Sequence, residues 1–548
     1  MAVVLGVNAV FHDPAAALVI DGEIVAAAEE ERFSRRKHGK EPVPFSTWEV
    51  PQLSASWCLA HAGISPEDLD AVAYSYDPAL APPMTSDITS SGWESLRTLY
   101  AWRAPLFLET ALPGLDPACV RFIPHHVAHA ASAYLAGPFD SCSVMILDGR
   151  GEYASYLAGH SNGGELQVLA TQELPHSLGL LYEDVTDHLG FKRASDEYKV
   201  MALASYGEPV FLPEFRRIVR TNAEGGFSIA PAELGTLVKR RRKEERWSQE
   251  HADLAASLQR RLEEVLLELA FWIHQQTGES RLAIAGGVAL NCVANSYLAH
   301  HGPFDEIWVQ PAAGDAGTAL GGALYLAQQM GDEIEPMRTA ALGREWTNAA
   351  LRAALESATV PYEEPEDLAG AVAEALAEDA IVAWFQGRSE YGPRALGHRS
   401  LLAHPGNPGN LERINAIKGR EEFRPVAPMV LEGRAGEMFD GPLPSPFMLF
   451  THRVLDEWRE RIPAVVHVDG TSRIQTVDPK AEPLVAQLLD EFDKRTGLPV
   501  LVNTSFNTAG RPIVDHPRDA LECFGSSPVD VLAIGPFLVR RSALRSGR

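Results

Sequence analysis

The chain has 548 residues, and a usual domain size of about 150 residues predicts three or four units. Hydrophobic residues make up 46% of it and charged residues 22%, which is typical of a soluble globular protein. The formal net charge of −25 argues against a nucleic-acid partner, because a polyanion would be repelled by most of the surface. We also expect no membrane association: the first residues carry no basic segment, and no stretch approaches ~20 uninterrupted apolar residues.

The cysteines do not indicate a functional site. The chain has five of them, they are scattered, and none forms a CxxC pair. This usage suits a reducing cytoplasm and excludes a cysteine-based zinc site. We therefore expect a cytoplasmic protein.

The first strand and its hairpin return later in the chain. Val3–Asn8 is predicted as a buried strand, followed by a polar loop at Phe11–Pro14 and a hairpin that turns at Asp21-Gly22. A second strand, polar loop and hairpin occupy Ser143–Thr171, about 140 residues further on. The repetition predicts a duplicated domain with a cleft between its halves. The alternative is an ordinary α/β protein that contains two unrelated hairpins.

Three segments between these repeats and the next motifs are less specific. The charge run Glu29–His38 is typical of a solvated face, although its place after a strand would also suit a polar acceptor site. Thr85–Gly92 and Gly207–Lys239 are weakly patterned and are predicted as loops or insertions. His251–Gln276 has helical periodicity and is predicted as a packing helix.

Two histidines lie four residues apart at the start of an alanine-rich segment. On a helix His125 and His129 would project from one face, one turn apart, and could hold one divalent ion if carboxylates complete the set. The alternative is a partly buried polar helix whose histidines bind nothing, since HxxxH is a frequent accident. Asp148, at the end of the second repeated strand, supplies a candidate carboxylate.

Two glycine-rich turns follow predicted strands. Gly286–Asn291 and Pro311–Thr318 each begin where a strand ends, and such turns let a backbone approach a phosphate. Either turn alone would also serve ordinary packing. Together with the duplication they favour a nucleotide cleft, for which Gly286, Gly287 and Asn291 are the candidates. Asp315 adds a second carboxylate, so His125, His129, Asp148 and Asp315 form a candidate set for a divalent ion.

The last third of the chain contains its densest basic stretch. After a break near Ala341–Thr347 and a predicted helix and strand, seven basic residues face only four acidic ones, a local charge of +3. Guanidinium groups bind phosphates bidentately, so we place anionic substrates here; the alternative is a surface helix with salt bridges. The polar run Asn503–Asn507 follows another strand and suits a phosphate or ribose. The basic residues are Arg388, Arg394, Arg399, Arg413, Lys418, Arg420 and Arg424.

These motifs resemble the NodU/CmcH O-carbamoyltransferases, and the likeness runs essentially from end to end. The motifs, in order, are Phe11-His12-Asp13, Glu29–Phe33, His125–His129, Asp148-Gly149, Gly286–Asn291, Tyr391–Ser400 and Asn503–Asn507. The resemblance implies an α/β protein with a duplicated actin-like (ASKHA, ribonuclease H-like) domain at 1–343 and a YrdC-like α/β domain at 344–548. It implies that the second domain makes carbamoyl adenylate from carbamoyl phosphate and ATP. The first would then pass the carbamoyl group to an acceptor hydroxyl.

The resemblance also assigns roles to residues. It implies an iron-type metal site at the four residues named above, although mixed N/O ligation also admits Mn²⁺, Zn²⁺ or Mg²⁺. It makes His12 the residue that takes the acceptor's proton. Arg150 departs from the pattern, because related chains tend to have a small or neutral residue there. The implied carbamoyl-phosphate and adenylate contacts are Arg394, Lys418, Arg424, Arg473, Asn503 and Ser505.

Two other classes of function remain open from the sequence. An ASKHA-type kinase of a sugar or small alcohol would leave the basic second domain without a role. A non-enzymatic nucleotide sensor would not need two histidines with two aspartates. Hydrogenase-maturation carbamoyltransferases add zinc-binding CxxC repeats, which this chain lacks. The acceptor is expected to be a small molecule, a secondary metabolite or antibiotic, and a homodimer is compatible with the sequence.

Overall fold

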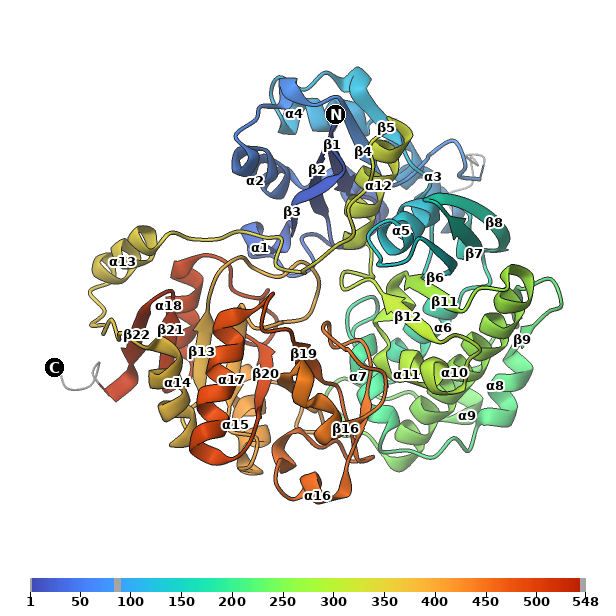
Figure 1. Cartoon of the computed structure of the whole chain (residues 1–548). Helices are drawn as coiled ribbons and strands as arrows, with labels where there is room; N and C mark the ends of the chain where they lie inside the picture. The colour runs from blue at the N-terminus through green and yellow to red at the C-terminus, as the bar shows by residue number, and fades with distance from the viewer. Residues whose placement is uncertain (1, 83–89, 543–548) are drawn as a thin grey trace. The chain divides into compact units, whose positions relative to one another are not determined.

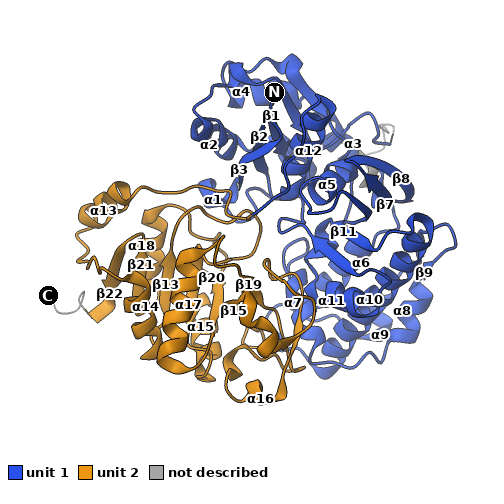
Figure 2. Cartoon of the chain, viewed as in Figure 1, with its two compact units in different colours: residues 1–338 blue, residues 339–548 orange. Residues whose placement is uncertain are grey.

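The computed structural model describes residues 2–82 and 90–542, with the side chains of residues 90–92 left out. The chain divides into two compact units, Met1–Arg338 (unit 1) and Thr339–Arg548 (unit 2), coloured separately in Figure 2. The sequence placed the boundary after residue 343. Most of the weakly patterned segment Thr85–Gly92 lies outside the described residues.

The first sheet of unit 1 has the strand order β3-β2-β1-β4-β5 (Figure 1). Strand β1 pairs antiparallel with β2, which pairs antiparallel with β3, and β1 is parallel to β4, which is parallel to β5. The hairpin turn at Asp21-Gly22 joins β2 to β3, as predicted. The strands are β1 (Val3–Asn8), β2 (Ala15–Ile20), β3 (Glu23–Glu29), β4 (Ala71–Tyr74) and β5 (Val120–Phe122).

The second sheet repeats this order. Read from its hairpin edge it is β8-β7-β6-β11-β12, with two antiparallel pairs followed by two parallel ones. The same succession of five strands in both halves confirms the predicted duplication and gives unit 1 its ASKHA-type fold. The strands are β6 (Ser141–Leu147), β7 (Ala154–Asn162), β8 (Glu165–Glu173), β11 (Arg281–Ala285) and β12 (Glu306–Val309).

Two helices of unit 1 pack closely because glycines remove side chains between them. Helix α12 (Ala316–Gln329) packs on β1 and on α5 (His125–Tyr134). A Cβ on Gly6 would lie 1.8 Å from the carbonyl oxygen of Ala319, and one on Gly321 would lie 1.8 Å from that of Ala128. These two positions therefore need glycine. The close packing fixes the start of α12 beside the start of α5.

The remaining elements of unit 1 correct two predictions. Gly207–Lys239 is not a loop, because it contains two helices and a two-stranded sheet. The charge run is not a solvated face at its start, because Glu29, Glu30, Glu31 and Arg32 are buried. The helix predicted at His251–Gln276 is confirmed as α10. These elements are α1 (Glu31–Ser34), α2 (Gln52–Ala62), α3 (Ser90–Trp102), α4 (Ala104–Ala111), α6 (Leu178–His188), α7 (Glu197–Ala204), α8 (Leu212–Ile218), β9 (Val219–Thr221), β10 (Phe227–Ile229), α9 (Leu234–Leu237), α10 (Gln249–Thr277) and α11 (Cys292–His301).

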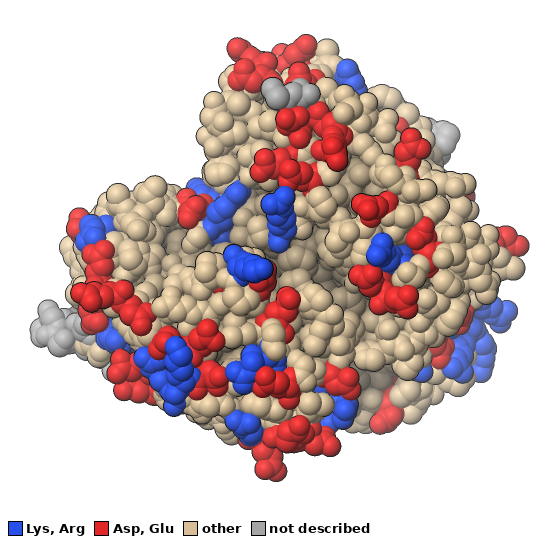
Figure 3. Space-filling model, in the orientation of Figure 1, with Lys and Arg blue, Asp and Glu red and all other residues tan. Residues whose placement is uncertain are grey.

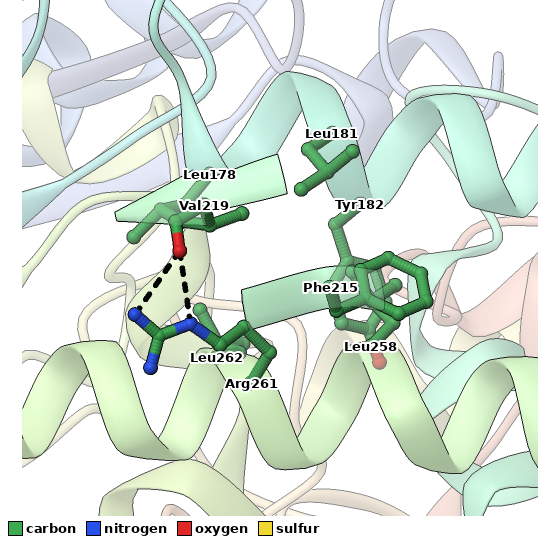
Figure 4. Close-up of a pocket in the computed structure, with 8 residues that line it drawn as sticks. All are labelled: Leu178, Leu181, Tyr182, Phe215, Val219, Leu258, Arg261 and Leu262. Carbon is green, nitrogen blue, oxygen red and sulfur yellow. Dashed lines mark hydrogen bonds between the residues drawn. The ribbon is translucent and has the colours of Figure 1, made fainter. Parts of the chain in front are cut away.

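A small cavity lies among α6, α8 and α10 (Figure 4). Its volume is about 10 Å³ and its lining is mostly aliphatic, so it has room for about one water molecule and not for a substrate. At its edge Arg261 donates two hydrogen bonds, of 3.2 and 3.1 Å, to the carbonyl oxygen of Val219. This cavity is a packing feature rather than a binding site.

Unit 2 is built on a seven-stranded mixed sheet with the order β19-β15-β20-β14-β13-β21-β22. Its core includes the fully buried Trp384, and helices α14 and α17 pack against each other beside the sheet. The strands are β13 (Val382–Phe385), β14 (Arg399–Ala403), β15 (Ala427–Leu431), β19 (Gln475–Val477), β20 (Val500–Ser505), β21 (Val531–Ile534) and β22 (Phe537–Arg540). A small sheet adds β16 (Phe439–Asp440), β17 (His452–Val454) and β18 (Thr471–Ser472); the helices are α13 (Asn348–Ser357), α14 (Leu368–Ala377), α15 (Gly409–Lys418), α16 (Asp456–Arg459), α17 (Pro483–Thr496) and α18 (Pro517–Ser526).

The surface agrees with the acidic composition. On the face shown in Figure 3, acidic side chains are spread over much of the molecule and basic ones occur in smaller groups. Among the described residues, no helix has the length and apolar character needed to span a bilayer.

Candidate functional site

Helix α5 carries the two predicted metal-binding histidines on one buried face. The rings of His125 and His129 have centroids 4.7 Å apart, and both side chains are inaccessible to solvent. The helix starts at His125, whose backbone amide donates a 2.8 Å hydrogen bond to Oε1 of Glu152. A carboxylate at this end satisfies a free N–H and complements the helix dipole.

Two carboxylates from segments distant in the sequence complete the cluster. Asp148 follows β6 directly, and Asp315 precedes the first residue of α12. Oδ2 of Asp148 lies 3.3 Å from Nε2 of His125 and 3.7 Å from Nε2 of His129. Oδ1 of Asp315 lies 3.7 Å from each of the same two nitrogens. The structure thus brings together all four predicted residues.

The donor geometry fits a metal ion. Four ligands at about 2.0–2.2 Å from a tetrahedral ion lie roughly 3.3–3.6 Å from one another, close to the distances found here. Nε2 of His129 is buried without a hydrogen-bond partner, which is costly unless an ion takes its lone pair. His125 donates from Nδ1 to the carbonyl oxygen of Ser75 over 3.1 Å, which leaves its Nε2 facing the carboxylates.

Without a cation, protons compensate the carboxylates. Burial lowers the pKa of His125, but the hydrogen bond to Asp148 and the nearby carboxylate of Asp315 outweigh it and hold that pKa well above its ordinary value. Burial raises the pKa of Asp148, but the hydrogen bond from His125 and the nearby ring of His129 hold it well below its usual range. A bound divalent ion would replace the proton on His125, so metal binding and proton release are linked.

His12 lies in the loop after β1, where the sequence placed it. Its side chain is about 30% exposed, and Nδ1 donates a 2.8 Å hydrogen bond to Oδ2 of Asp13. Asn8 holds this loop by donating from Nδ2 to the carbonyl oxygens of His12 and Asp13, over 3.0 and 2.9 Å. Phe11 packs edge-on against the ring of His125, with centroids 5.3 Å apart. The loop that carries His12 is therefore in contact with a predicted metal ligand.

The charge of His12 depends on these neighbours. Burial lowers its pKa, but the charges of Asp315, Asp13 and Asp148 outweigh this and raise the pKa to about 10. A general base must be neutral when it acts. A cation held by Asp148 and Asp315 would offset two of the three charges and bring the pKa of His12 back toward neutrality.

The first glycine-rich turn positions a metal ligand. Gly286 has φ 92° and lies so close to Leu147 that a Cβ would be 2.1 Å from its carbonyl oxygen. Gly287 donates its backbone amide to Oδ1 of Asp148 over 3.0 Å. Asn291 caps α11 by accepting from the amide of Ala294 over 3.0 Å. These contacts give all three residues a structural role; their contact with a nucleotide stays a prediction.

Arg150 is held by a salt bridge. Its Nη1 lies 3.4 Å from Oε1 of Glu94, whose other carboxylate oxygen accepts from Arg97. Arg97 is buried and lies over the ring of Phe11, 4.8 Å from its centroid. The described part of α3 is thus connected both to the loop of Asp148 and to the loop of His12.

Unit 2 contains a second polar cluster, around the end of β20. Lys418, the last residue of α15, is only 6% exposed, and its ammonium group donates to the carbonyl and hydroxyl oxygens of Ser505 and to Oδ1 of Asn507. The bonds to the Ser505 hydroxyl and to Oδ1 of Asn507 are 2.9 and 2.6 Å long. The structure therefore joins two of the predicted adenylate contacts directly.

Asn503 connects two more predicted contacts. It is fully buried and donates to the carbonyl oxygen of Ala395 over 3.1 Å and to Oε1 of Gln475 over 2.8 Å. Ala395 follows Arg394, and Gln475 lies two residues after Arg473. Nε of Arg473 is a buried donor without an acceptor, and Oδ1 of Asn503 is a buried acceptor without a donor. Buried donors of this kind favour an anionic ligand.

Arg424 is tied to the same helix. Asn415 of α15 donates to the carbonyl oxygen of Arg424 over 3.0 Å, and the guanidinium lies 3.8 Å from the carboxylate of Glu421. Of the other four basic residues, Arg399 donates to four backbone carbonyls and Arg388 to two. Arg413 pairs with Asp379 and Asp530, and Arg420 bonds to Asn415. These four residues have structural partners. The anion site that the sequence predicted is therefore limited to the residues around β20.

Three residues near the sites were missed from the sequence. Glu152 accepts from the amides of His125 and Asp77, and His38 shares the carboxylate of Asp13 with His12. Gln475 orients Asn503. The place of Glu152 in the Asp148 loop was the one available signal, since the other contacts join segments distant in sequence.

The chain is similar in sequence to curated proteins. The uncharacterized protein sll1178 of Synechocystis is 38% identical, over 98% of this chain and 97% of the relative. Nodulation protein NolNO of Sinorhizobium fredii is 38% identical, over 97% of this chain and 80% of the relative. Among solved structures, HypF of T. kodakarensis aligns with 61% of this chain and 49% of the HypF chain, with 15% identity and a TM-score of 0.34.

The fold and the clusters define a two-unit protein with an ASKHA-type domain, a four-residue candidate metal centre and a separate candidate anion site. Two protein-family models match the chain. The model for the carbamoyltransferase N-terminus matches residues 3–80 and 100–324, and that for the carbamoyltransferase C-terminus matches 373–541. The chain belongs to the carbamoyltransferase family.

Proposed function

We propose that this protein is an ATP-dependent O-carbamoyltransferase that acts on a hydroxyl of a small molecule, a secondary metabolite or antibiotic. The observation that carries the proposal is that each unit contains its own buried polar cluster of different chemistry. Unit 2 has the buried ammonium group of Lys418 beside the hydroxyl of Ser505, and the buried Nε donor of Arg473, which are suited to phosphates. Unit 1 has two histidines and two carboxylates beside a further histidine, suited to group transfer.

In unit 2 the carbamoyl group is activated. Its carbon is a poor electrophile because the nitrogen donates electrons into it. Carbamoyl phosphate, ATP and one water give carbamoyl adenylate, phosphate and pyrophosphate, and the adenylate carries AMP as a good leaving group. Lys418, Arg424, Arg394 and Arg473 would offset the charges of the phosphates, while Asn503 and Ser505 would contact the adenylate.

In unit 1 the activated group is transferred. The acceptor oxygen forms a bond to the carbamoyl carbon, the bond between that carbon and the AMP oxygen breaks, and AMP leaves with the electron pair. Nε2 of His12 takes the hydroxyl proton. His125, His129, Asp148 and Asp315 would hold the metal, Fe²⁺ by resemblance, and that ion would supply Lewis acidity when bound.

Product analysis tests the proposal. Purified protein is given ATP, carbamoyl phosphate and a panel of hydroxylated natural products, with mass detection of a carbamoyl gain. We expect AMP, pyrophosphate and phosphate, together with a carbamoylated acceptor. ADP with a phosphorylated acceptor would indicate an ASKHA-type kinase, and nucleotide binding without turnover would indicate a sensor. Either result would overturn the proposal.

A further inference from the structure

We propose that Asp13 is a positioning residue for carbamoyl transfer, because its carboxylate fixes the ring of His12 and anchors it through His38 to Ser195. The inference rests on the proposed function and adds residues to the site in unit 1. It concerns a hydrogen-bonded chain of four side chains that the sequence pattern did not connect.

Three short contacts join these four side chains. Oδ2 of Asp13 accepts from Nδ1 of His12 over 2.8 Å, and Oδ1 accepts from Nδ1 of His38 over 2.9 Å. Nε2 of His38 lies 2.8 Å from Oγ of Ser195. Both carboxylate oxygens are thus used, one for each imidazole. The chain connects the loop after β1 to the segment between α6 and α7, 157 residues away from His38.

This arrangement selects one tautomer of His12. When Nδ1 donates its proton to Asp13, the lone pair of a neutral ring lies on Nε2, which is the nitrogen that a substrate hydroxyl can reach. The side chains of His12 and Asp13 are 30% and 27% exposed, so the pair is open to a substrate. During transfer the acceptor proton would move to Nε2, and the resulting imidazolium would be paired with the Asp13 carboxylate.

The backbone of Asp13 supports a positioning role. Its φ of 48° lies in the left-handed region, which is uncommon for residues other than glycine and is tolerated best by Asn and Asp. Asn8 holds the carbonyl oxygen of Asp13 in this conformation. Strained backbone maintained by a buried side chain is frequent where a functional group must be held in place.

Other charged groups near these hydrogen-bonded side chains do not replace Asp13. Asp13, Glu31 and His38 could together be mistaken for a second metal site, but Glu31 already pairs with Arg32 and Lys37. The carboxylates of Asp315, Asp148 and Glu197 also act on His12 electrostatically. Among the described residues, Asp13 is the carboxylate that accepts a hydrogen bond from the His12 ring.

The first test compares Asp13→Asn with wild type in the metal-loaded full chain. Asparagine has the same shape and tolerates the left-handed backbone, so the fold should survive. We expect kcat for transfer to fall by about 10–10³-fold, with the acceptor KM within about twofold, because an orienting carboxylate acts on the transition state. Asp13→Glu, which keeps the charge, should recover part of kcat. Asp305→Asn, an exposed change in unit 1, is the matched control.

Two further readouts separate positioning from folding. Metal content and pyrophosphate release by Asp13→Asn should equal those of wild type. The pH at which kcat/KM rises should move lower, because Asp13 helps to raise the pKa of His12. An unchanged kcat, a change confined to KM, or an unshifted pH profile would overturn the inference. If wild type itself transfers nothing, the proposed function fails instead.

A measurement without substitutions covers the case in which Asp13→Asn does not fold. In zinc-loaded wild type with ¹⁵N-labelled histidine, the His12 ring should carry its proton on Nδ1 at a pH where it is neutral. A proton on Nε2 would overturn the inference. Ser195→Ala removes only the outermost contact, and we expect it to lower kcat by less than about threefold; a loss as large as that of Asp13→Asn would contradict the order of the chain.

Discussion

The backbone amide of Gly287 donates a 3.0 Å hydrogen bond to Oδ1 of Asp148, although 139 residues separate them in the sequence. Oδ2 of the same carboxylate faces His125 and His129. The glycine-rich turn after β11 therefore orients a candidate metal ligand. A backbone N–H group in a glycine-rich turn is suited to binding a phosphate. Here that N–H group binds a carboxylate of the chain itself.

The first prediction is that metal binding depends on both histidines of α5. A His125→Ala, His129→Ala double variant removes both nitrogen donors, so elemental analysis should find the bound metal reduced to background. His160→Ala, a change outside the cluster in the same unit, should leave it unaffected. Equal metal content in all three proteins would show that the ion, if present, lies elsewhere.

The second prediction concerns Gly151, in the loop that leads away from Asp148. A Cβ here would lie 2.6 Å from Nδ1 of His126, whose ring is buried beside the metal ligands. Gly151→Ala should therefore cost about 1–3 kcal/mol of stability and lower the Tm. Gly149→Ala is a matched control, because its nearest contact would be 3.4 Å away, at Oε1 of Glu183. Equal Tm values for the two variants would contradict the crowding at His126.

The third prediction is a pH dependence that appears when metal is removed. Raised pKa values stabilise the folded state at pH values below the unfolded pKa, and this stability is lost as pH rises through the folded pKa. For His12 the interval runs from 6.5 to about 10, and His125 shifts in the same direction. Chelated protein should thus lose Tm between about pH 6.5 and 9. The lowered pKa values of Asp13 and Asp148 predict a separate loss in acid.

Calorimetry with and without metal checks this third prediction. A bound cation takes the place of the proton on His125, so the alkaline loss should shrink in metal-loaded protein. His12→Ala in chelated protein should remove part of the dependence. A Tm that stays constant from pH 6.5 to about 9 without metal would contradict the raised pKa values.

Much of the candidate metal site could be predicted from sequence because its signals are local. HxxxH spacing places His125 and His129 on one helical face, and Asp148 follows a recognisable strand. The repeated hairpin likewise predicted the duplicated sheets. Each of these patterns depends on the period of a single element, which the sequence contains in full.

The errors arose where distant segments decide the outcome. Glu30 was predicted to lie on a solvated face, yet it is buried and accepts from the backbone amides of Leu53 and Ser54. Arg399 was predicted to lie in the anion site, yet its guanidinium donates to backbone carbonyls of two other segments, at Arg344 and at Gln386-Gly387. The sequence alone does not distinguish a charged side chain that faces solvent or a ligand from one that binds other parts of the protein. Only the partners in three dimensions distinguish them.

The fourth prediction divides the reaction between the two units. Arg424→Ala removes a phosphate-binding charge from unit 2, which should cost several kcal/mol of transition-state stabilisation in adenylate formation. His12→Ala removes the general base from unit 1, which should slow transfer by roughly 10²–10⁴-fold. The first variant should therefore fail with ATP and carbamoyl phosphate, yet carbamoylate an acceptor when supplied with carbamoyl adenylate. The second should form adenylate, with pyrophosphate release, and transfer it slowly.

The matched control for Arg424 is Arg453→Ala, which removes an exposed ion pair with Asp440 in the same unit and should leave both half-reactions unchanged. Pyrophosphate release and mass detection of carbamoylated acceptor measure the halves separately. Loss of the same half-reaction in the Arg424 and His12 variants would refute the division between units. A normal transfer rate in His12→Ala alone would remove only that residue from the mechanism, because a water could then take the acceptor's proton while Lys418 and Arg424 still support adenylate formation.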